Sequence, residues 1–171
     1  MKRATIDRTS VVLIGMPGAG KSTLGVLLAK ALALDFVDTD VLIQLREGRT
    51  LQQILDAADY LRLRAIEEET ILAAEPRRCV VATGGSAVYS RRSMEHLRSF
   101  GPIVFLDVPL DELERRITNF ASRGIAADPS QSLEALFEER RALYLEHADL
   151  RIDVASQRPE KLIDEIVAQV T

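Results

Sequence analysis

A glycine-rich stretch near the start of the chain restricts the possible folds more than any other part of the sequence. It reads LIGMPGAGKSTLG over residues 13–25, with the spacing Gly15, four residues, Gly20, Lys21 and Ser22. The β-branched run before it predicts a short buried strand, and leucines at helical spacing after it predict a helix. A strand, a glycine loop and a helix in this order are typical of a phosphate-binding loop, or P-loop. We therefore expect a nucleotide site at the end of the first strand.

Each part of this loop has a physical task. Glycines let the backbone pass close to a phosphate, so that successive N–H groups point at its oxygens, and the following helix adds its positive end. The Lys21 ammonium is expected to reach the outer phosphates and to be catalytic, and the Ser22 hydroxyl to ligate Mg²⁺. A glycine turn without a ligand is the alternative, but the whole motif stands in the context that phosphate binding requires. The expected phosphate-binding residues are Gly15, Gly18, Ala19, Gly20, Lys21, Ser22 and Thr23.

Composition limits the classes of protein. The 171 residues suffice for one domain, and the net charge of −4, without a long basic run, argues against a nucleic-acid partner. No stretch approaches the length of a membrane span, and residues 1–10 lack the apolar core of a signal peptide. The single cysteine, Cys79, cannot form an internal disulfide. We expect a cytoplasmic monomer without membrane or nucleic-acid partners.

Short apolar runs alternate with helical patterns along the whole chain. Such an order favours an α/β fold, with a parallel sheet covered by helices on both faces. The expected strands cover residues 10–14, 36–40, 79–85, 103–108 and 150–154, and the expected helices cover residues 21–34, 51–74, 90–99, 111–121, 132–147 and 159–170. The segment 122–132 has no hydrophobic period and is rich in Gly, Pro, Ser and Ala, so we expect a mobile loop there.

Carboxylates stand at the ends of two expected strands. FVDTD ends with Asp38 and Asp40, and IVFLD ends with Asp107. Two carboxylates two residues apart on an extended segment face the same side, so Asp38 and Asp40 could both face a cleft at the carboxyl end of the sheet. One could hold Mg²⁺ and the other a substrate hydroxyl, or each could cap the next helix. Guanine recognition through Asn-Lys-x-Asp is excluded, because Phe120 follows the only asparagine, Asn119.

Five stretches in a fixed order add a resemblance. GMPGAGKSTLG, DTD, LRAIE, ATGGS and ERRALY extend over nearly the whole chain, and together they resemble the shikimate kinase family. The resemblance implies a P-loop, three-layer α/β/α fold with five strands, like that of nucleoside monophosphate kinases, in one domain over residues 1–171. It implies a substrate-binding helical region at about 41–75 and a lid at about 122–132. It also implies transfer of the γ-phosphoryl group of ATP to a hydroxyl of a small cyclic hydroxy acid, with Mg²⁺.

The resemblance assigns roles to residues that spacing alone leaves open. It implies that Asp38 assists the metal, that Asp40 binds and helps to activate the accepting hydroxyl, and that Asp107 is not catalytic. The expected substrate-binding residues are Asp40, Arg64, Gly84, Gly85 and Arg140. Arg64 and Glu67 lie one helical turn apart, so that the carboxylate can hold the guanidinium toward a substrate carboxylate. Taken without the resemblance, such a pair is usually a solvated surface pair.

Three further arginines match family positions around the nucleotide. Arg123 opens the expected lid, where an arginine closes onto the transferring phosphates and offsets charge in the transition state. Arg116 and Arg158 match positions near the adenine. A lone arginine in a loop or at a helix end would otherwise indicate little.

The departures from the family pattern fall in the acceptor half. Leucines stand where aromatic residues are usual, a serine replaces the third glycine of the Gly-Gly-Gly motif, and the lid and the ERxPLY motif lack their prolines. The positions are Leu55, Leu63, Ser86, Gly124 and Ala142. The acceptor expected first is shikimate, phosphorylated to shikimate 3-phosphate. The alternatives are a kinase for another hydroxy or sugar acid, and a nucleotide-binding regulatory protein without acceptor chemistry.

Overall fold

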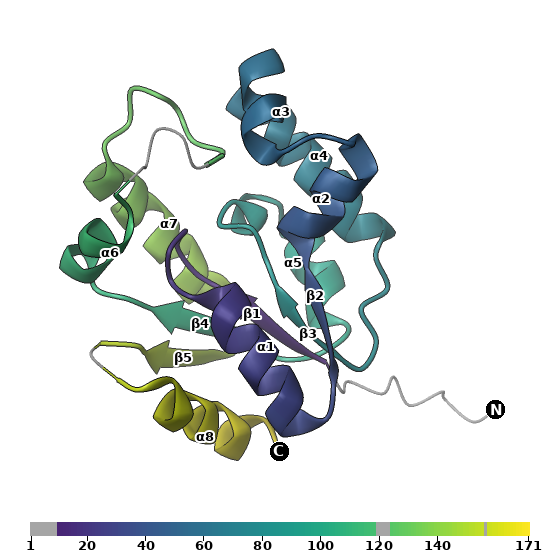
Figure 1. Ribbon diagram of the computed structural model, residues 1–171, viewed down its shortest axis with the longest axis vertical. Helices are drawn as coiled ribbons and strands as arrows, with labels where there is room; N and C mark the ends of the chain where they lie inside the picture. The colour runs from purple at the N-terminus through teal and green to yellow at the C-terminus, as the bar shows by residue number, and fades with distance from the viewer. Residues whose placement is uncertain (1–9, 119–123, 156) are drawn as a thin grey trace.

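The computed structural model describes residues 10–118, 124–155 and 157–171, and its centre is a parallel sheet of five strands in the order β2-β3-β1-β4-β5 (Figure 1). The strands are β1 (Val11–Ile14), β2 (Asp35–Asp38), β3 (Cys79–Ala82), β4 (Ile103–Asp107) and β5 (Leu150–Asp153). All four strand pairs are parallel, so the predicted sheet is confirmed. The order reverses beside β1, which opens a crevice at the carboxyl ends of β1 and its neighbours.

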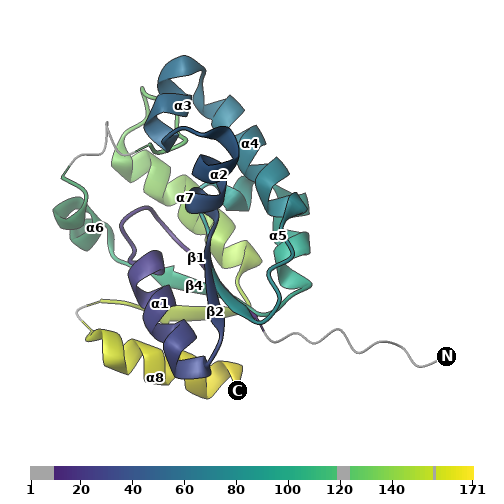
Figure 2. The same ribbon diagram turned by 45° about the vertical axis from the view of Figure 1, so that its right-hand side comes forward.

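Helices cover both faces of this sheet. The helices are α1 (Lys21–Leu32), α2 (Thr39–Glu47), α3 (Leu51–Ala57), α4 (Tyr60–Ala73), α5 (Arg91–Arg98), α6 (Leu110–Arg116), α7 (Leu133–His147) and α8 (Pro159–Val170), with a 3₁₀ turn, η1 (Ala87–Tyr89). In Figures 1 and 2, α1 and α8 lie on one face and α5 and α7 on the other, while α2, α3 and α4 rise beyond the carboxyl end of β2. The predicted three-layer α/β/α architecture is therefore confirmed.

Several elements differ from the sequence-based prediction. The strand expected over residues 79–85 ends at Ala82, and the helix expected over residues 111–121 ends at Arg116. The expected strand over residues 36–40 ends at Asp38, and Thr39 begins α2, which the resemblance covered only as part of a helical region at about 41–75. The expected helix over residues 51–74 is two helices, because the chain breaks at Ala58 and Asp59 caps a new helix through its side chain. The sequence also predicts a capping box from Thr50 and Gln53, three residues apart before an apolar run, and the structure has it. These changes place a three-helix unit beside the end of β2.

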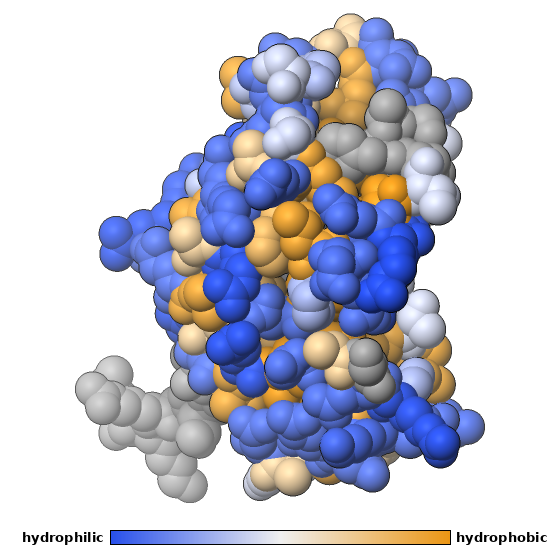
Figure 3. Space-filling view, turned by 90° about the vertical axis from the view of Figure 1, so that its left-hand side faces the viewer, coloured by the Kyte–Doolittle hydropathy of each residue, from blue (hydrophilic) through white to orange (hydrophobic). Residues whose placement is uncertain are grey.

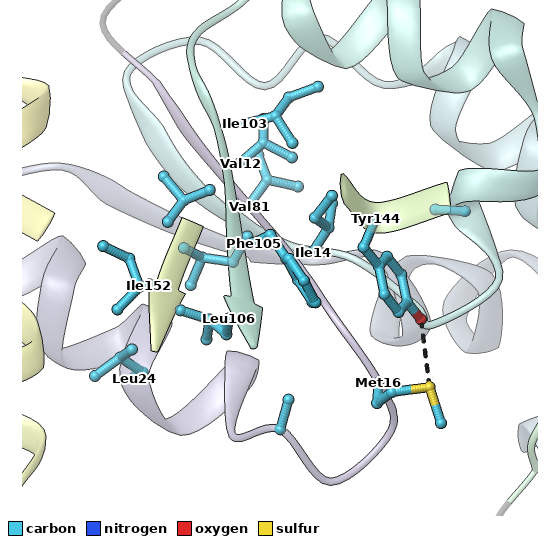
Figure 4. Packing of buried hydrophobic residues seen from close by; sticks show 14 of the residues in the cluster. Val12, Ile14, Met16, Leu24, Val81, Ile103, Phe105, Leu106, Tyr144 and Ile152 are labelled. Atoms are coloured by element: carbon cyan, nitrogen blue, oxygen red, sulfur yellow. Dashed lines mark hydrogen bonds between the residues drawn. The ribbon is translucent and has the colours of Figure 1, made fainter. Parts of the chain in front are cut away.

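The core is aliphatic and centres on β1, β3 and β4, whose residues are all buried. Figure 4 shows side chains of these strands packed against those of α1, α7 and β5, with Phe105 beside Tyr144. The two ring centroids are 5.1 Å apart. A smaller cluster lies beneath the three-helix unit, formed by Ile43, Ile54, Leu63, Ile66 and Ala126. Packing of this second cluster holds α2, α3 and α4 against one another and against Ala126.

Polar residues predominate on one face of the molecule. The face seen in Figure 3, which includes α6, is mostly hydrophilic, and hydrophobic residues emerge only in small areas between charged ones. None of the helices in the described part of the chain has the length and apolar character needed to cross a membrane.

Candidate active site

A cavity of about 390 Å³ opens at the carboxyl ends of β1 and β3. The P-loop and the start of α1 form one wall, and α2, α4, the turn after β3 and α7 form the other. Residues 124–126, at the end of the predicted lid, also line the cavity. The cavity therefore joins the predicted nucleotide site to the predicted acceptor site.

The P-loop has the conformation that phosphate binding requires. Gly15 has φ of 149°, and a Cβ at this position would lie 2.8 Å from the Leu106 carbonyl oxygen, so only glycine fits. Gly20, at φ 89°, precedes the first turn of α1. The Lys21 ammonium is buried and donates to the carbonyl oxygens of Gly15, at 2.7 Å, and Met16, at 2.9 Å. Burial lowers the pKa of Lys21 to about 8, partly opposed by the Asp40 carboxylate.

Ser22 and Asp38 lie together, as the predicted metal site requires. The Ser22 hydroxyl donates to Asp38 Oδ2 at 2.6 Å, and Asp38 Oδ1 accepts from the Asp40 N–H at 2.9 Å and so caps α2. A hydroxyl and a carboxylate beside a phosphate loop are the oxygen donors that Mg²⁺ uses. In the described ranges no group of three or more His, Cys, Asp or Glu side chains could hold a metal. Ser22 and Asp38 fit a magnesium ion by the chemistry of their oxygen atoms.

Asp40 lies in the first turn of α2, and not on the extended segment that the sequence predicted. The turn from β2 into α2 directs the Asp40 carboxylate into the cavity, while Asp38 stays beside Ser22. Burial, together with the nearby Asp38 carboxylate, raises the pKa of Asp40 to about 6. Asp40 is therefore a carboxylate that can accept a proton near neutral pH.

Glu67 is a second buried carboxylate in this cavity, and its place was not predicted. Only 3% of its surface is exposed, its Oε2 accepts from the Ser86 hydroxyl, and its Oε1 has no hydrogen-bond partner. Burial and the charge of Asp40 raise the pKa of Glu67 to about 7. The expected pairing of Glu67 with Arg64 is wrong, because no ion pair among the described residues joins them. The sequence signal for Glu67 was only its place in LRAIE, one turn after an arginine.

Gly84 and Gly85 allow close packing around the acceptor side. A Cβ on Gly84 would overlap Glu67 Oε1 and would lie 2.7 Å from Asp40 Oδ1, and one on Gly85 would lie 2.8 Å from Arg140 Nη1. The Gly84 N–H donates to Thr39 Oγ1 at 2.9 Å, and Tyr144 donates to the Gly85 carbonyl oxygen at 2.6 Å. The turn after β3 is thereby tied to α2 and to α7.

Arg140 and Arg64 both donate a hydrogen bond to the carbonyl oxygen of Ala126. Arg140 lines the cavity and is 1% exposed, and its Nη2 donates to the Ala126 carbonyl oxygen at 2.8 Å. Arg64 Nε donates to the same oxygen at 3.1 Å, but Arg64 lines two neighbouring hollows and not the main cavity. Its guanidinium lies between the rings of Tyr60 and Tyr89, at 5.0 and 3.7 Å from their centroids. Arg64 therefore adjoins the cavity behind Ala126.

The remaining predicted nucleotide residues lie at different distances from the cavity. Arg116 Nη1 donates to the Gly18 carbonyl oxygen at 3.3 Å, and Arg116 also pairs with Glu112, so it lies against the P-loop. Arg158 is exposed at the start of α8 and is not among the described residues that line the cavity. Arg123 lies outside the described residues.

The positions that depart from the family pattern do not all reach the site. Leu63, Ser86 and Gly124 line the cavity, whereas Leu55 packs at the edge of the second cluster and Ala142 is exposed on α7. The Ser86 hydroxyl points to Glu67. The acceptor wall is thus aliphatic at Leu63.

Asp107, the other strand-end carboxylate, is structural. It is 5% exposed, and its Oδ2 accepts from Arg141 and from Arg151, each at 2.8 Å. It is not among the residues that line the cavity in the described part of the chain. The pair of arginines joins β4 to α7 and β5.

The cavity has a P-loop with a buried lysine and a hydroxyl beside a carboxylate, and its second wall has a proton acceptor and an arginine. Together these features define a P-loop phosphotransferase for a small anionic acceptor. A profile of the family described as shikimate kinase matches residues 17–171. Shikimate kinases of Rhodococcus jostii and Synechococcus elongatus are 37% and 39% identical to this chain, over 93% and 95% of it and 96% and 86% of their own lengths. The chain belongs to the shikimate kinase family. It is an ATP-dependent kinase that phosphorylates a hydroxyl group.

Solved structures agree with this assignment. The shikimate kinase from Acinetobacter baumannii, solved in complex with shikimate, superposes with a TM-score of 0.85 and 28% identity, over 95% of this chain and 92% of that one. The shikimate kinase from Aquifex aeolicus has a TM-score of 0.79 and 31% identity, over 93% of this chain and 94% of that one.

Proposed function

We propose that the protein transfers the γ-phosphoryl group of Mg·ATP to a hydroxyl of shikimate, giving shikimate 3-phosphate. The observation that carries this proposal is the single cavity in which Lys21 and Ser22 face Asp40, Gly84 and Arg140. Its two walls offer what in-line transfer needs, which is a phosphate cradle on one side and a held hydroxyl on the other.

On the acceptor side, Asp40 binds the reacting hydroxyl and accepts its proton. The raised pKa of Asp40, about 6, brings its basicity closer to that of a useful proton acceptor at neutral pH. Arg140, together with Arg64, binds the acceptor carboxylate, and Gly84 and Gly85 let the backbone approach the ring. Residues 41–75 form the substrate-binding helical region of a single domain.

On the nucleotide side, the loop residues Gly15 to Thr23 hold the phosphates and Lys21 neutralises charge that develops during transfer. Ser22 and Asp38 would hold Mg²⁺, which when bound neutralises phosphate charge and orients the transferring group. Arg116 and Arg158 contribute to the adenine side. A lid at about 122–132, and a role of Arg123 toward the transferring phosphates, stay predictions from the resemblance. The cytoplasmic location and the monomeric state stay predictions from the sequence.

One observation favours a second acceptor, another hydroxy or sugar acid. The wall opposite the P-loop carries Ile43, Leu51 and Leu63, which are aliphatic and give a ring no flat face to stack on. Such a wall would accept a linear acid as readily as a cyclic one.

The test is the release of ADP with Mg·ATP and shikimate, beside quinate, gluconate and a control without acceptor. The expected result is strong stimulation by shikimate, with the 3-phosphate ester found by NMR. Stimulation by another acid with shikimate inert would move the proposal to that acid. Binding of ATP with no stimulated turnover by any acid would indicate a nucleotide-binding regulatory protein.

A further inference from the structure

Two positive charges lie side by side next to the acceptor site without a carboxylate between them. Arg64 Nε and Arg140 Nη2 donate to the same neutral oxygen, the carbonyl of Ala126, at 3.1 and 2.8 Å. Two guanidinium groups on one neutral acceptor repel each other, because the carbonyl oxygen neutralises neither charge. Something else must hold them together.

Tyr89 contacts both guanidinium groups. Its ring centroid lies 3.7 Å from Arg64 Cζ and 5.4 Å from Arg140 Cζ, and its hydroxyl accepts from Arg140 Nε at 3.4 Å. The negative face of an aromatic ring attracts a cation without neutralising it. The ring therefore keeps both arginines in place and leaves their charge available for an anionic ligand.

Tyr89 also binds Glu139, a carboxylate that would otherwise compete with the acceptor for the two arginines. Its hydroxyl donates to Glu139 Oε1, and Gln131 donates to Glu139 Oε2 at 3.0 Å. Glu139 and Arg64 line the same hollow, so a free Glu139 would be a ready partner for Arg64. With both of its oxygens engaged by neutral donors, Glu139 stays off the arginines.

Hydrogen bonds on both sides of Tyr89 fix the backbone that carries its ring. Tyr89 ends η1, which directly follows Gly84, Gly85 and Ser86, and its N–H donates to the Ser86 carbonyl oxygen at 3.1 Å. The next residue, Ser90, caps α5 through its side chain. A residue held at both sides can fix the direction of the two guanidinium groups that contact its ring.

We propose that Tyr89 is a positioning and specificity-determining residue, which aligns Arg64 and Arg140 for the carboxylate of the acceptor. The inference rests on the proposed function, since it takes the acceptor to be a carboxylic acid. It assigns the preference for an acid over a neutral polyol to a residue that itself need not touch the acceptor.

The test compares Tyr89→Leu and Tyr89→Phe with the wild type, on shikimate and on its carboxamide, which lacks the negative charge. Loss of a cation–ring contact and release of Glu139 should raise the KM of Tyr89→Leu for shikimate about tenfold, with kcat and the KM for ATP nearly unchanged. Tyr89→Phe keeps the ring and should raise this KM only about two- to threefold. With the carboxamide, wild type and both variants should have the same kcat/KM.

Phe100→Leu is the matched control. Phe100 is an aromatic residue that lies against an arginine, Arg77, at 5.7 Å and outside the cavity. Its removal should leave the kinetics with both acceptors unchanged. An equal loss for shikimate and the carboxamide in Tyr89→Leu, or no loss for either, would overturn the assignment of Tyr89.

Failure of the proposed function gives a different result. It would appear in the wild type as an absence of phosphorylated shikimate. Calorimetric titration of wild type and Tyr89→Leu with shikimate and the carboxamide in the presence of Mg·ADP then decides the role of Tyr89. Weaker binding of shikimate alone by the variant supports it, and equal binding, or no binding of shikimate by either protein, contradicts it.

Discussion

The two walls of the cavity are built in different ways. The nucleotide wall comes from one contiguous stretch, residues 15–23, whose backbone groups and two adjacent side chains we propose to bind the phosphates. The acceptor wall is assembled from side chains of α2, α4 and α7 and from the turn after β3. A local loop keeps its geometry through its own dihedral angles, whereas the acceptor wall depends on the packing of distant segments. The difference predicts that changes on the acceptor wall alter acceptor use and leave nucleotide binding intact.

The largest effect is expected from Asp40→Asn. Loss of the proton acceptor should lower kcat by about 10²- to 10⁴-fold, while the Kd for ATP stays unchanged. Single-turnover phosphoryl transfer measures the loss of rate, and nucleotide titration measures the Kd for ATP. Asp107→Asn is the control, because Asp107 is a buried carboxylate that does not line the cavity and pairs with Arg141 and Arg151. It should reduce the free energy of unfolding by about 1–3 kcal/mol, since both arginines are partly exposed, and leave the chemistry of the folded enzyme intact. Loss of ATP binding in Asp40→Asn would show that the two walls are not separate.

Gly84→Ala should have the next largest effect. Its Cβ would overlap Glu67 Oε1 and press on Asp40 Oδ1, so both carboxylates must move. We expect the acceptor KM to rise about tenfold or more, with the KM for ATP unchanged. Gly48→Ala is the control. Gly48 ends α2 at φ 63°, with open space around a Cβ, so its replacement should cost about 1 kcal/mol of stability and no activity. Equal kinetics for both variants would contradict the close packing at Gly84.

Glu67→Gln tests how much the buried Glu67 carboxylate lowers the stability of the folded protein. Burial raises the pKa of Glu67 from 4.5 to about 7, so in this range the folded protein holds a proton that the unfolded chain has lost. The stability of the wild type therefore falls as pH rises through this window, and glutamine removes that dependence. Relative to the wild type, the variant should gain about 1–3 kcal/mol between pH 4.5 and pH 7. Denaturant unfolding measures this gain. The exposed Glu138→Gln should show none, and a constant difference for Glu67→Gln would refute the raised pKa.

The pH dependence of acceptor use should be the smallest effect close to neutral pH, where Asp40 is mostly ionised. Asp40 must be ionised to accept a proton, and its pKa is raised from 3.8 to about 6 by burial and by Asp38. We expect kcat/KM for the acceptor to fall about tenfold per pH unit below pH 6. The affinity for ATP, measured by titration over the same range, should not follow this profile. A break near the ordinary carboxyl pKa would mean that Asp40 is solvated in the working enzyme.

The fold could be predicted to the extent that its signals are local. The strand runs, the P-loop, the Thr50 capping box and the start of α8 at Pro159 are patterns within a few residues, and the structure has them as predicted. The break at Ala58 and the early start of α2 were missed, because capping by Asp38 and Asp59 competes with strand and helix continuation and the outcome depends on tertiary packing.

The candidate site divides in the same way. Gly15 to Thr23 could be identified from spacing, because the phosphate ligands are consecutive in the chain. The places of Asp40, Gly84 and Arg140 were expected only from a resemblance, and Glu67 was expected to hold Arg64. Glu67 instead accepts from Ser86, and Arg64 lies between two tyrosines and reaches Ala126. The contact of Glu67 with Ser86 and that of Arg64 with Ala126 join residues 19 and 62 positions apart, which no local pattern specifies.

By itself the sequence determined the alternation of strands and helices and the position of the phosphate loop, since both follow from hydrophobic periodicity and from glycine dihedral angles over short distances. Only the tertiary structure decided which charges face one another. The burial of Glu67, the shared carbonyl of Ala126 and the ring of Tyr89 between two arginines arise where α4, α7 and the turn after β3 meet. Burial and charge then set the pKa values and the direction of each side chain, because both depend on neighbours that are distant along the chain.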